Sequence, residues 1–403
     1  MLSHLFRRTT LLPKCTHLWS TQKYTCPRRV DPPYYKVVNK YENSLESKFK
    51  DGLNILKEEF NNDPSSNYPH DGFHFTTIEN IFKYIDNAAY IREVFLPDNK
   101  DLKMIKNGNR WRSNMMILGN KYELADIDTL KELVNRGADI HAEPAYSEGY
   151  YSNALLWASH GGYLDIVKYL VGIGFDVCFP NNAALKFAAE NGHFEIVKYL
   201  VENDSRVCAN NEWALGLASL NGHFEIVKYL VEHRNGDCKM TSDDCNWFVA
   251  KYLIDVRDER TMHHKRHLLY KDSHNGALIA ASHGGHLDIV KYLVEMGEDI
   301  HAENEYALRL AARYGHFDIL KFLTEKGADI HIVCGGESTL DLACTYGHFD
   351  IVKYLVERGA KIYCNYTIDV TSNGGYSEIV EYLKEKNRDQ PPSLFNPYRF
   401  NQK

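Results

Sequence analysis

The sequence predicts a mostly α-helical protein: a solenoid of about eight or nine helix pairs preceded by a small α+β domain. Two observations support this prediction. A ten-residue phrase, typified by GHFEIVKYLV, recurs about every 30 residues through the last two thirds of the chain. The chain, at 403 residues, is also too long for one ordinary hydrophobic core.

Residues 1–35 are predicted to be a basic, disordered leader. Residues 1–30 contain six arginines or lysines, seven serines or threonines and no acidic residue. This composition also fits a mitochondrial transit peptide, so targeting is the alternative interpretation. The apolar residues near the N-terminus form too short a stretch for a secretory signal.

Residues 36–120 contain no copy of the phrase and are predicted to form the α+β domain. The expected elements are a helix over Leu53–Phe60, a strand over Phe73–Phe75, a helix that opens with a capping box at Thr76–Glu79 and runs through Ile85, and a strand over Tyr90–Leu96. The apolar side chains expected to pack against them are Trp111, Met115, Met116 and Leu118.

Residues 121–388 are predicted to form the repeat array, followed by a flexible tail over 389–403. Strong copies of the phrase begin at positions 162, 192, 222, 285, 315 and 347, and weaker ones at 125 and 375. The 63 residues between 222 and 285 are about twice the period, which predicts a degenerate repeat near 236–275. That repeat is the expected weak point, because each unit of a solenoid is stabilised by its neighbours.

Each phrase has the pattern of an amphipathic helix. In the copy at 192, Ile196, Val197, Leu200 and Val201 form one apolar stripe. A shorter segment rich in alanine precedes it and ends at Gly192, whose backbone freedom suits a helix C-terminus. A turn phrase such as GADIHA at 137 follows, and we expect it to lead into a short hairpin.

This unit of helix, glycine turn, helix and turn phrase resembles the ankyrin repeat, whose signature is T-P-L-H-x-A. The chain departs from that signature, because Trp213-Ala214 and Tyr306-Ala307 replace Thr-Pro and Arg309 or Asp341 replaces the histidine. We therefore expect the usual side-chain hydrogen bonds of the signature to be lost. The many KYLV and GADIH phrases are similar to the ankyrin proteins of giant DNA viruses.

The resemblance implies a non-enzymatic scaffold that binds a protein partner through a concave surface of first helices and hairpins. Carried over by register, the candidate contact residues are Tyr146, Tyr150, Tyr151, His160, Glu190, Glu212, Trp213, Leu220, His283, Glu305, Tyr306, Arg313, Tyr314 and Tyr346. For Trp213 and Tyr306 the alternative is that they fill the space left by the missing Thr-Pro pairs. Two further hypotheses are an adaptor, whose N-terminal domain engages a ubiquitin ligase or similar machine, and an enzyme in that domain.

No motif for catalysis, cofactor binding or metal binding is expected to be functional. Cysteine or histidine recurs at one register position, at His141, Cys178, Cys208, Cys238, His301 and His331. Stacked helices lie about 8–10 Å apart, too far for neighbouring repeats to share a zinc ion. The cluster His263, His264, His267 and His274 lacks a closed ligand set, and the repeated histidine of the phrase is interpreted as packing.

Charge and cysteine content constrain the partner and the compartment. Residues 1–120 carry 18 basic and 13 acidic residues, which leaves 29 basic and 41 acidic residues for 121–403. An acidic array is unsuited to nucleic acid. The nine scattered cysteines predict a reducing intracellular compartment, such as a host cytoplasm if the protein is viral. No apolar run is long enough to predict membrane insertion.

Overall fold

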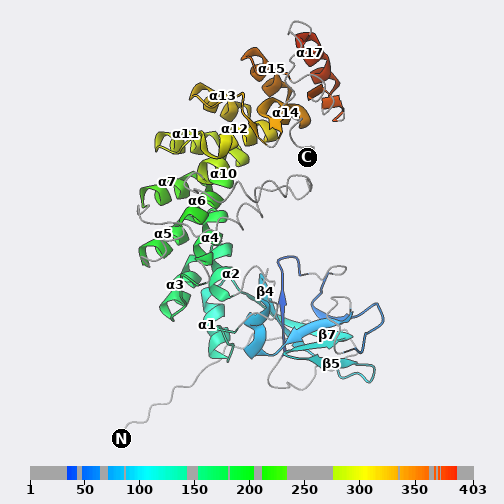
Figure 1. The fold of residues 1–403 in the computed structure, drawn as a ribbon. Helices are drawn as coiled ribbons and strands as arrows, with labels where there is room; N and C mark the ends of the chain where they lie inside the picture. Colours follow the sequence, from blue (N-terminus) through cyan, green and yellow to red (C-terminus); the bar gives the residue numbers. More distant parts are fainter. Residues whose placement is uncertain are drawn as a thin grey trace, which may run out of the picture. The chain divides into compact units, whose positions relative to one another are not determined.

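The computed structural model describes residues 34–42, 48–63, 71–85, 88–142, 153–179, 182–203, 211–233, 276–334, 336–362, 367–368, 371–372 and 374–387. The chain divides into two compact units, Met1–Ala154 and Leu155–Lys403. The first unit contains the sheet, and the second contains the stacked helices (Figure 1).

The first unit is built on an antiparallel sheet of seven strands in the order β2-β7-β4-β1-β3-β6-β5. Its strands are β1 (Tyr34–Val38), β2 (Gly52–Ile55), β3 (Phe73–Thr76), β4 (Tyr90–Phe95), β5 (Met104–Asn107), β6 (Arg110–Ser113) and β7 (Met115–Glu123). The 3-10 helix η2 (Ile78–Tyr84) and helix α1 (Ile127–Asn135) complete the described elements of the unit.

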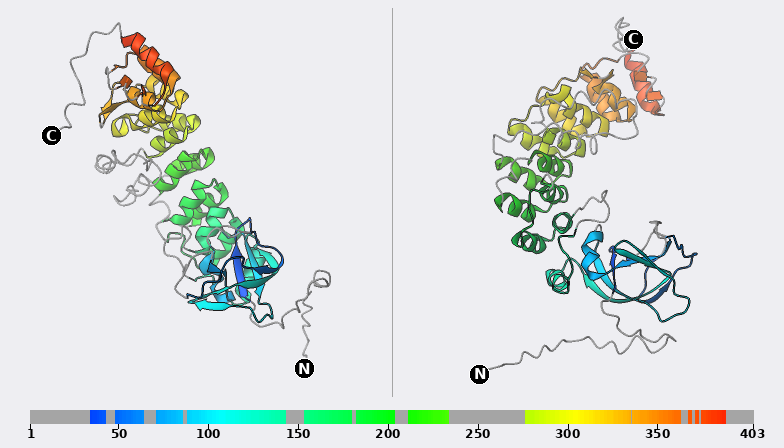
Figure 2. Two further views of the ribbon diagram at one scale, coloured as in Figure 1. Left: turned by 90° about the vertical axis from the view of Figure 1, so that its right-hand side faces the viewer. Right: turned by 60° about the horizontal axis from the view of Figure 1, so that its bottom comes forward.

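One face of this sheet carries a buried hydrophobic cluster. Register partners point to the same face, so Tyr34 of β1 lies beside Val94 of β4, which in turn lies beside Leu118 of β7. The strands of the sheet curve strongly (Figure 2). The buried members of the cluster are Val38, Phe49, Phe73, Phe75, Val94, Met116 and Leu118, with Trp111 packed at its margin.

Three predictions for this unit need correction. The stretch from Leu53 is a strand and not a helix, because β2 pairs with the buried strand β7 and strand pairing outweighs local helix propensity. The predicted capping box at Thr76–Glu79 does not form: Thr77 is the N-cap, without a side-chain cap bond, and the Thr76 hydroxyl donates to Asn109 O at 2.6 Å. The described unit is therefore mainly β, whereas the strands predicted at Phe73 and Tyr90 are confirmed.

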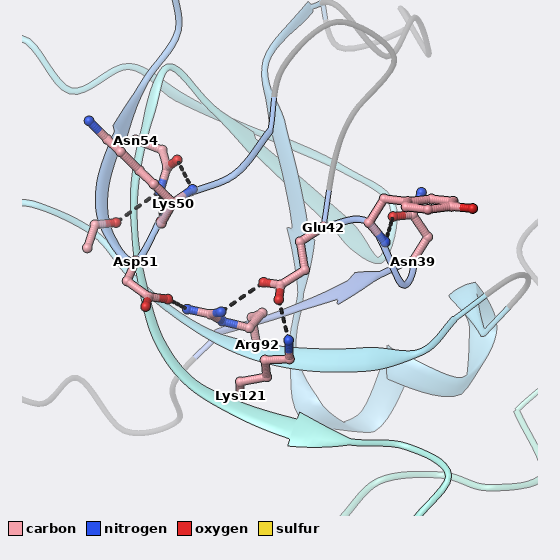
Figure 3. Close-up of polar contacts among 9 residues, drawn as sticks. Asn39, Glu42, Lys50, Asp51, Asn54, Arg92 and Lys121 are labelled. Carbon is pink, nitrogen blue, oxygen red and sulfur yellow. Dashed lines mark hydrogen bonds and ion pairs between the residues drawn. The ribbon is translucent and has the colours of Figure 1, made fainter.

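A buried arginine links distant segments of this unit (Figure 3). The Arg92 guanidinium of β4 donates to Glu42 Oε2 at 2.8 Å and also pairs with Asp51. Lys121 of β7 pairs with the other oxygen of Glu42. Four charges from four segments thus compensate one another, which satisfies the requirement that a buried charge be paired.

The first copy of the phrase, helix α1, belongs to the sheet unit. Asp126 caps its N-terminus by accepting hydrogen bonds from the backbone N–H groups of Asp128 and Thr129. At its C-terminus, Arg136 donates to the Tyr35 hydroxyl of β1 and lies 3.6 Å from Glu93 of β4. The phrase at 125 is therefore a helix, as predicted, and Arg136 at its C-terminus joins it to the sheet.

The second unit stacks helix pairs in two rows (Figure 1). The first helices are α2 (Ala154–Gly161), α4 (Ala183–Glu190), α6 (Asn211–Leu220), α10 (Gly276–Gly284), α12 (Ala302–Tyr314) and α14 (Thr339–Thr345). The second helices are α3 (Leu164–Gly172), α5 (Phe194–Asn203), α7 (Phe224–Glu232), α11 (Leu287–Glu295), α13 (Phe317–Glu325), α15 (Phe349–Glu357) and α17 (Ser377–Asn387). All eight copies of the phrase, α1 included, form helices, as their periodicity predicts.

A glycine of positive φ separates the two helices in each of the six strong repeats, and in four of them, those at 162, 285, 315 and 347, a second one follows the second helix. The inter-helix glycine, such as Gly285 at φ +83°, ends the first helix, and a second, such as Gly297 at φ +95°, ends the second helix. In the turn phrase that follows, Asp299 Oδ1 accepts a hydrogen bond from the backbone N–H of His301. Among the described turns, only the one after α13 leads into a hairpin, β8 (Val333–Cys334) and β9 (Glu337–Ser338).

The repeated histidine of the phrase joins neighbouring repeats. Its Nε2 donates to the backbone carbonyl at the end of the preceding first helix, an oxygen that has no partner within its own helix. The five bonds, 2.9–3.0 Å long, run from His193 to His160, from His223 to Glu190, from His286 to Leu220, from His316 to His283 and from His348 to Arg313. The interpretation of this histidine as a packing residue is confirmed.

The bond from His286 to Leu220 shows that α10 stacks directly on α6, although the two residues are 66 positions apart. Phe224 and Tyr292 make the same edge-on ring contact, at 5.6 Å between centroids, as Phe194 and Tyr229. The degenerate repeat predicted at 236–275 lies outside the described residues.

Shortening the connection between α7 and α10 is therefore expected to leave the array folded. Residues 234–275 separate the described ends of α7 and α10 and number 42. Deleting residues 238–271 leaves eight of them, which is close to the seven residues, 204–210, that join α5 to α6. The entropic cost of closing the shorter loop is about 1.4 kcal/mol smaller, so the deletion should stabilise the array slightly. Urea unfolding of the full chain and of the deletion variant measures the effect. A loss of the α6–α10 contact, seen as faster amide exchange in both helices, would contradict the direct stacking.

Candidate functional site

The candidate interaction face is formed by the first helices of the second unit. In five of the six repeats, the residue two positions before the inter-helix glycine accepts the histidine bond through its backbone carbonyl, so neighbouring repeats hold its backbone in a fixed relation. In the sixth, at Thr345, the next repeat has Tyr376 in place of the histidine. We call these residues the end row, and their side chains are half-buried except for that of Arg313, which is buried. The end row is His160, Glu190, Leu220, His283, Arg313 and Thr345.

The middle of this face is a packed apolar cluster. Trp213 of α6 is 4% exposed and packs with Leu217 of the same helix and with Ile279 of α10 and Leu310 of α12. Tyr306, Leu220 and Tyr314 pack against its edge. Lys186 Nζ of α4 also lies 4.4 Å from the Trp213 ring centroid. This burial favours the alternative that Trp213 fills the space left by the missing Thr-Pro pair over its prediction as a contact residue.

Helix α12 adds two arginines to the edge of this cluster. The Arg309 guanidinium lies 5.8 Å from the Tyr306 ring centroid, and that of Arg313 lies 5.7 Å from Tyr314 and 5.0 Å from Tyr346. Burial raises the pKa of Tyr306, and the two arginines oppose that rise. The side chains are four residues apart on one helix, so they form a single cationic and aromatic strip.

His283 of α10 lies beside this strip, with its ring 4.4 Å from that of Tyr314. Burial lowers the pKa of the His283 imidazole, and the nearby His316 and Arg313 lower it further. The imidazole is therefore biased towards its neutral form, so the positive charge at this end of the face comes from the arginines.

Glu305 is the second predicted contact residue that turns out to be buried. It is 5% exposed, and its Oε1 lies 2.6 Å from Nδ1 of His301, an interaction that raises the pKa of His301. Glu303, Asn304 and Glu305 have positive φ, so the regular part of α12 begins after them. Glu305 turns inwards because this left-handed segment redirects it towards His301.

One repeat recovers the hydrogen bonds that we expected to be lost with the family signature. In α14, Ser338 and Asp341 form a reciprocal capping box, with Asp341 Oδ2 2.7 Å from Ser338 Oγ. The other carboxylate oxygen accepts from the hydroxyl of Thr367 in the next repeat at 2.6 Å. A serine and an aspartate thus replace the threonine and histidine of the signature here.

Three serines in the first helices bury hydroxyls without a hydrogen-bond partner in the described part of the chain. Ser159, Ser219 and Ser282 occupy one register position and are fully buried. Ala189 and Ala312 occupy the same position in other repeats. The serine hydroxyls therefore lose water without gaining a partner.

Replacing each serine by alanine is expected to stabilise the array by about 1 kcal/mol, because the cost of the unpaired hydroxyl is removed. Urea unfolding of Ser219→Ala and of the triple variant measures the gain. The reciprocal change Ala312→Ser is the matched control and is expected to lower stability by a similar amount. No gain in the triple variant, together with no loss in the control, would contradict the assignment.

The remaining predicted positions divide between described and undescribed residues. Tyr146, Tyr150 and Tyr151, the His263–His274 cluster, Cys208 and Cys238 lie outside the described residues, as does the side chain of Glu212. His141, Cys178, His301 and His331 stand in turns, where their backbone N–H groups bind the aspartate two residues earlier. Within the described ranges no three potential metal ligands gather.

Sequence reasoning missed one unusual group in the first unit. Lys36 of β1 donates from Nζ to His74 O at 2.8 Å and lies 4.8 Å from the Phe49 ring centroid. Burial, aided by Arg110, lowers the pKa of Lys36 to about 8. The sequence contained one signal for this group: Lys36 alternates with Tyr34 and Val38, so a charged residue stands on the apolar face of the strand.

Two rows of stacked helices with a face of arginine and tyrosine define a helix-pair repeat protein. The family model for ankyrin repeats (3 copies) matches residues 122–211, 155–244, 242–334 and 278–366, which together cover more than half of the chain. The chain belongs to the ankyrin-repeat family. The match at 242–334 includes most of the segment predicted to be a degenerate repeat.

Known relatives are giant-virus proteins. The ankyrin repeat protein R868 of Acanthamoeba polyphaga mimivirus is 38% identical over 141 residues, which are 34% of this chain and 66% of the relative. The uncharacterized protein R869 of the same virus is 39% identical over 140 residues, 34% of this chain and 96% of the relative. The repeats are therefore of the giant-virus type.

Among solved structures, the human ASB11 ankyrin repeat domain is 19% identical with a TM-score of 0.44, and the match covers 60% of this chain and all of that domain. None of the described helices is long and apolar enough to cross a membrane. Ankyrin repeats indicate a module for protein–protein interaction.

Proposed function

We propose that the array binds a protein partner through the face of its first helices, the concave surface expected of an ankyrin array. The end row and the residues beside it support this proposal, because they present polar and aromatic side chains that remain partly accessible on a rigid scaffold. Tyrosine and arginine dominate the binding energy of many interfaces. Tyr314 is half-buried and Tyr346 is exposed, so both retain surface that a partner can cover.

Affinity purification with the full chain as bait tests this proposal. The variant Tyr314→Ala/Tyr346→Ala removes two rings from the face of the first helices. The matched control, Tyr169→Ala/Tyr199→Ala, removes two half-buried rings from the second helices α3 and α5. We expect the first variant to lose a partner that the control retains. If every associated protein is bound equally by both variants, the proposed face is wrong.

A further inference from the structure

The strip on α12 is positively charged, whereas the net charge of the array is negative. Residues 121–403 carry 12 more acidic than basic residues, yet Arg309 and Arg313 lie together on the face of the first helices. A local cationic strip on an acidic array favours an acidic group that lies close to it, because screening limits the repulsion from more distant charges.

Arg309 is the residue of the strip best suited to bind an acidic group, because its charge is not neutralised within the described part of the chain. No carboxylate there lies within ion-pair distance of it, and its Nε is buried without a hydrogen-bond partner. Its side chain is half-buried, so part of it remains accessible. The accessible part of the guanidinium can therefore bind an acceptor that a partner supplies.

Two acidic residues of the same face are already engaged. Asp341 uses both carboxylate oxygens, on Ser338 and Thr367. Glu305 is buried and bonds to His301. The Tyr306 ring under Arg309 limits the freedom of its guanidinium, so the planar donor fork is ordered before any partner arrives.

We propose that Arg309 binds the carboxylate of an aspartate or glutamate in a segment of the partner protein, with Tyr306 and Arg313 beside it. Arginine and carboxylate form two parallel hydrogen bonds, which gives this contact directional specificity as well as charge complementarity. This inference rests on the proposed function, because it specifies the chemistry of the partner that the face of the first helices binds.

A phage-displayed library of random 12-residue peptides, selected on the full chain, is the probe. We expect the selected peptides to share an aspartate or glutamate. Arg309→Gln is expected to weaken their binding about tenfold to a hundredfold, the loss typical of a charge-assisted hydrogen bond. Arg358→Gln is the matched control, because Arg358 also lies over a tyrosine, Tyr354, but on the second helix α15.

Three results separate the inference from the proposed function. Selected peptides that lack acidic residues but lose binding in Tyr314→Ala/Tyr346→Ala overturn the inference and leave the face intact. Peptides that bind all variants equally overturn both. Selection on Arg309→Glu is expected to favour lysine or arginine in place of the acidic residue, and continued enrichment of acidic peptides on that variant overturns the inference even if Arg309→Gln folds poorly.

Discussion

Replacing Arg92 by methionine is expected to lower the free energy of opening of the N-terminal sheet by about 3 kcal/mol. The side chain of Arg92 is 5% exposed and that of its partner Glu42 is 17% exposed, so the variant leaves a largely buried carboxylate with a weaker set of partners. Lys121 remains paired with Glu42, which keeps the effect near the lower end of the range for broken buried pairs. The second partner, Asp51, is 79% exposed and can be solvated by water.

Amide hydrogen exchange of the full chain measures this loss locally, in β1, β4 and β7. Lys121→Met is the matched control, because the Lys121 side chain is 40% exposed and an exposed ion pair contributes at most about 1 kcal/mol. The double variant Arg92→Met/Glu42→Gln is expected to be more stable than the sum of the two single losses predicts, because it removes both members of the buried pair and leaves no buried charge unpaired. Equal exchange rates in Arg92→Met and Lys121→Met would show that the buried ion pair of Arg92 contributes no more than the exposed pair of Lys121.

Gly285→Ala is expected to destabilise the array by about 2–4 kcal/mol. The left-handed backbone at φ +83° costs a residue with a Cβ about 1–2 kcal/mol. The added Cβ would also lie 2.6 Å from the His316 ring, so the ring must move. That movement breaks the bond from His316 Nε2 to His283 O and leaves a helix-end carbonyl without its partner.

Gly297→Ala separates these two contributions. Gly297 has a φ of +95°, and a Cβ there would meet nothing within 4 Å. Its variant should therefore show the backbone cost alone, about 1–2 kcal/mol. Urea unfolding of both variants gives the difference, and exchange in α10 and α13 locates it. Equal losses in the two variants would show that the contact between histidine and glycine adds no stability.

The array was predictable because its signals are local. The stripe of Ile196, Val197 and Leu200 repeats at helical spacing within one phrase, and all three side chains are buried. The strand at Leu53 was mistaken for a helix because its partner, β7, lies more than 60 residues away, and no local pattern reports that pairing. The small domain consequently contains more strand than predicted.

The candidate site was predictable only in outline. Register placed the end row, but the sequence cannot show how much of each side chain its neighbours cover. Trp213 and Glu305 were chosen as residue types common at interfaces, yet α10 and α12 cover Trp213, and the left-handed segment of α12 turns Glu305 inwards. Arg309 appeared only as a departure from the family signature. Its unpaired charge became visible once its surroundings were known.

The sequence alone determined the helix pairs, the glycine turns and the family, because each of these depends on residues within about 30 positions. Only the tertiary structure decided that α10 stacks on α6 across 66 positions, that Arg92 pairs with Glu42 and Asp51, and which side chains of the face of the first helices stay accessible. These properties depend on contacts between segments far apart in the chain, and burial and charge pairing exist only once those segments have come together.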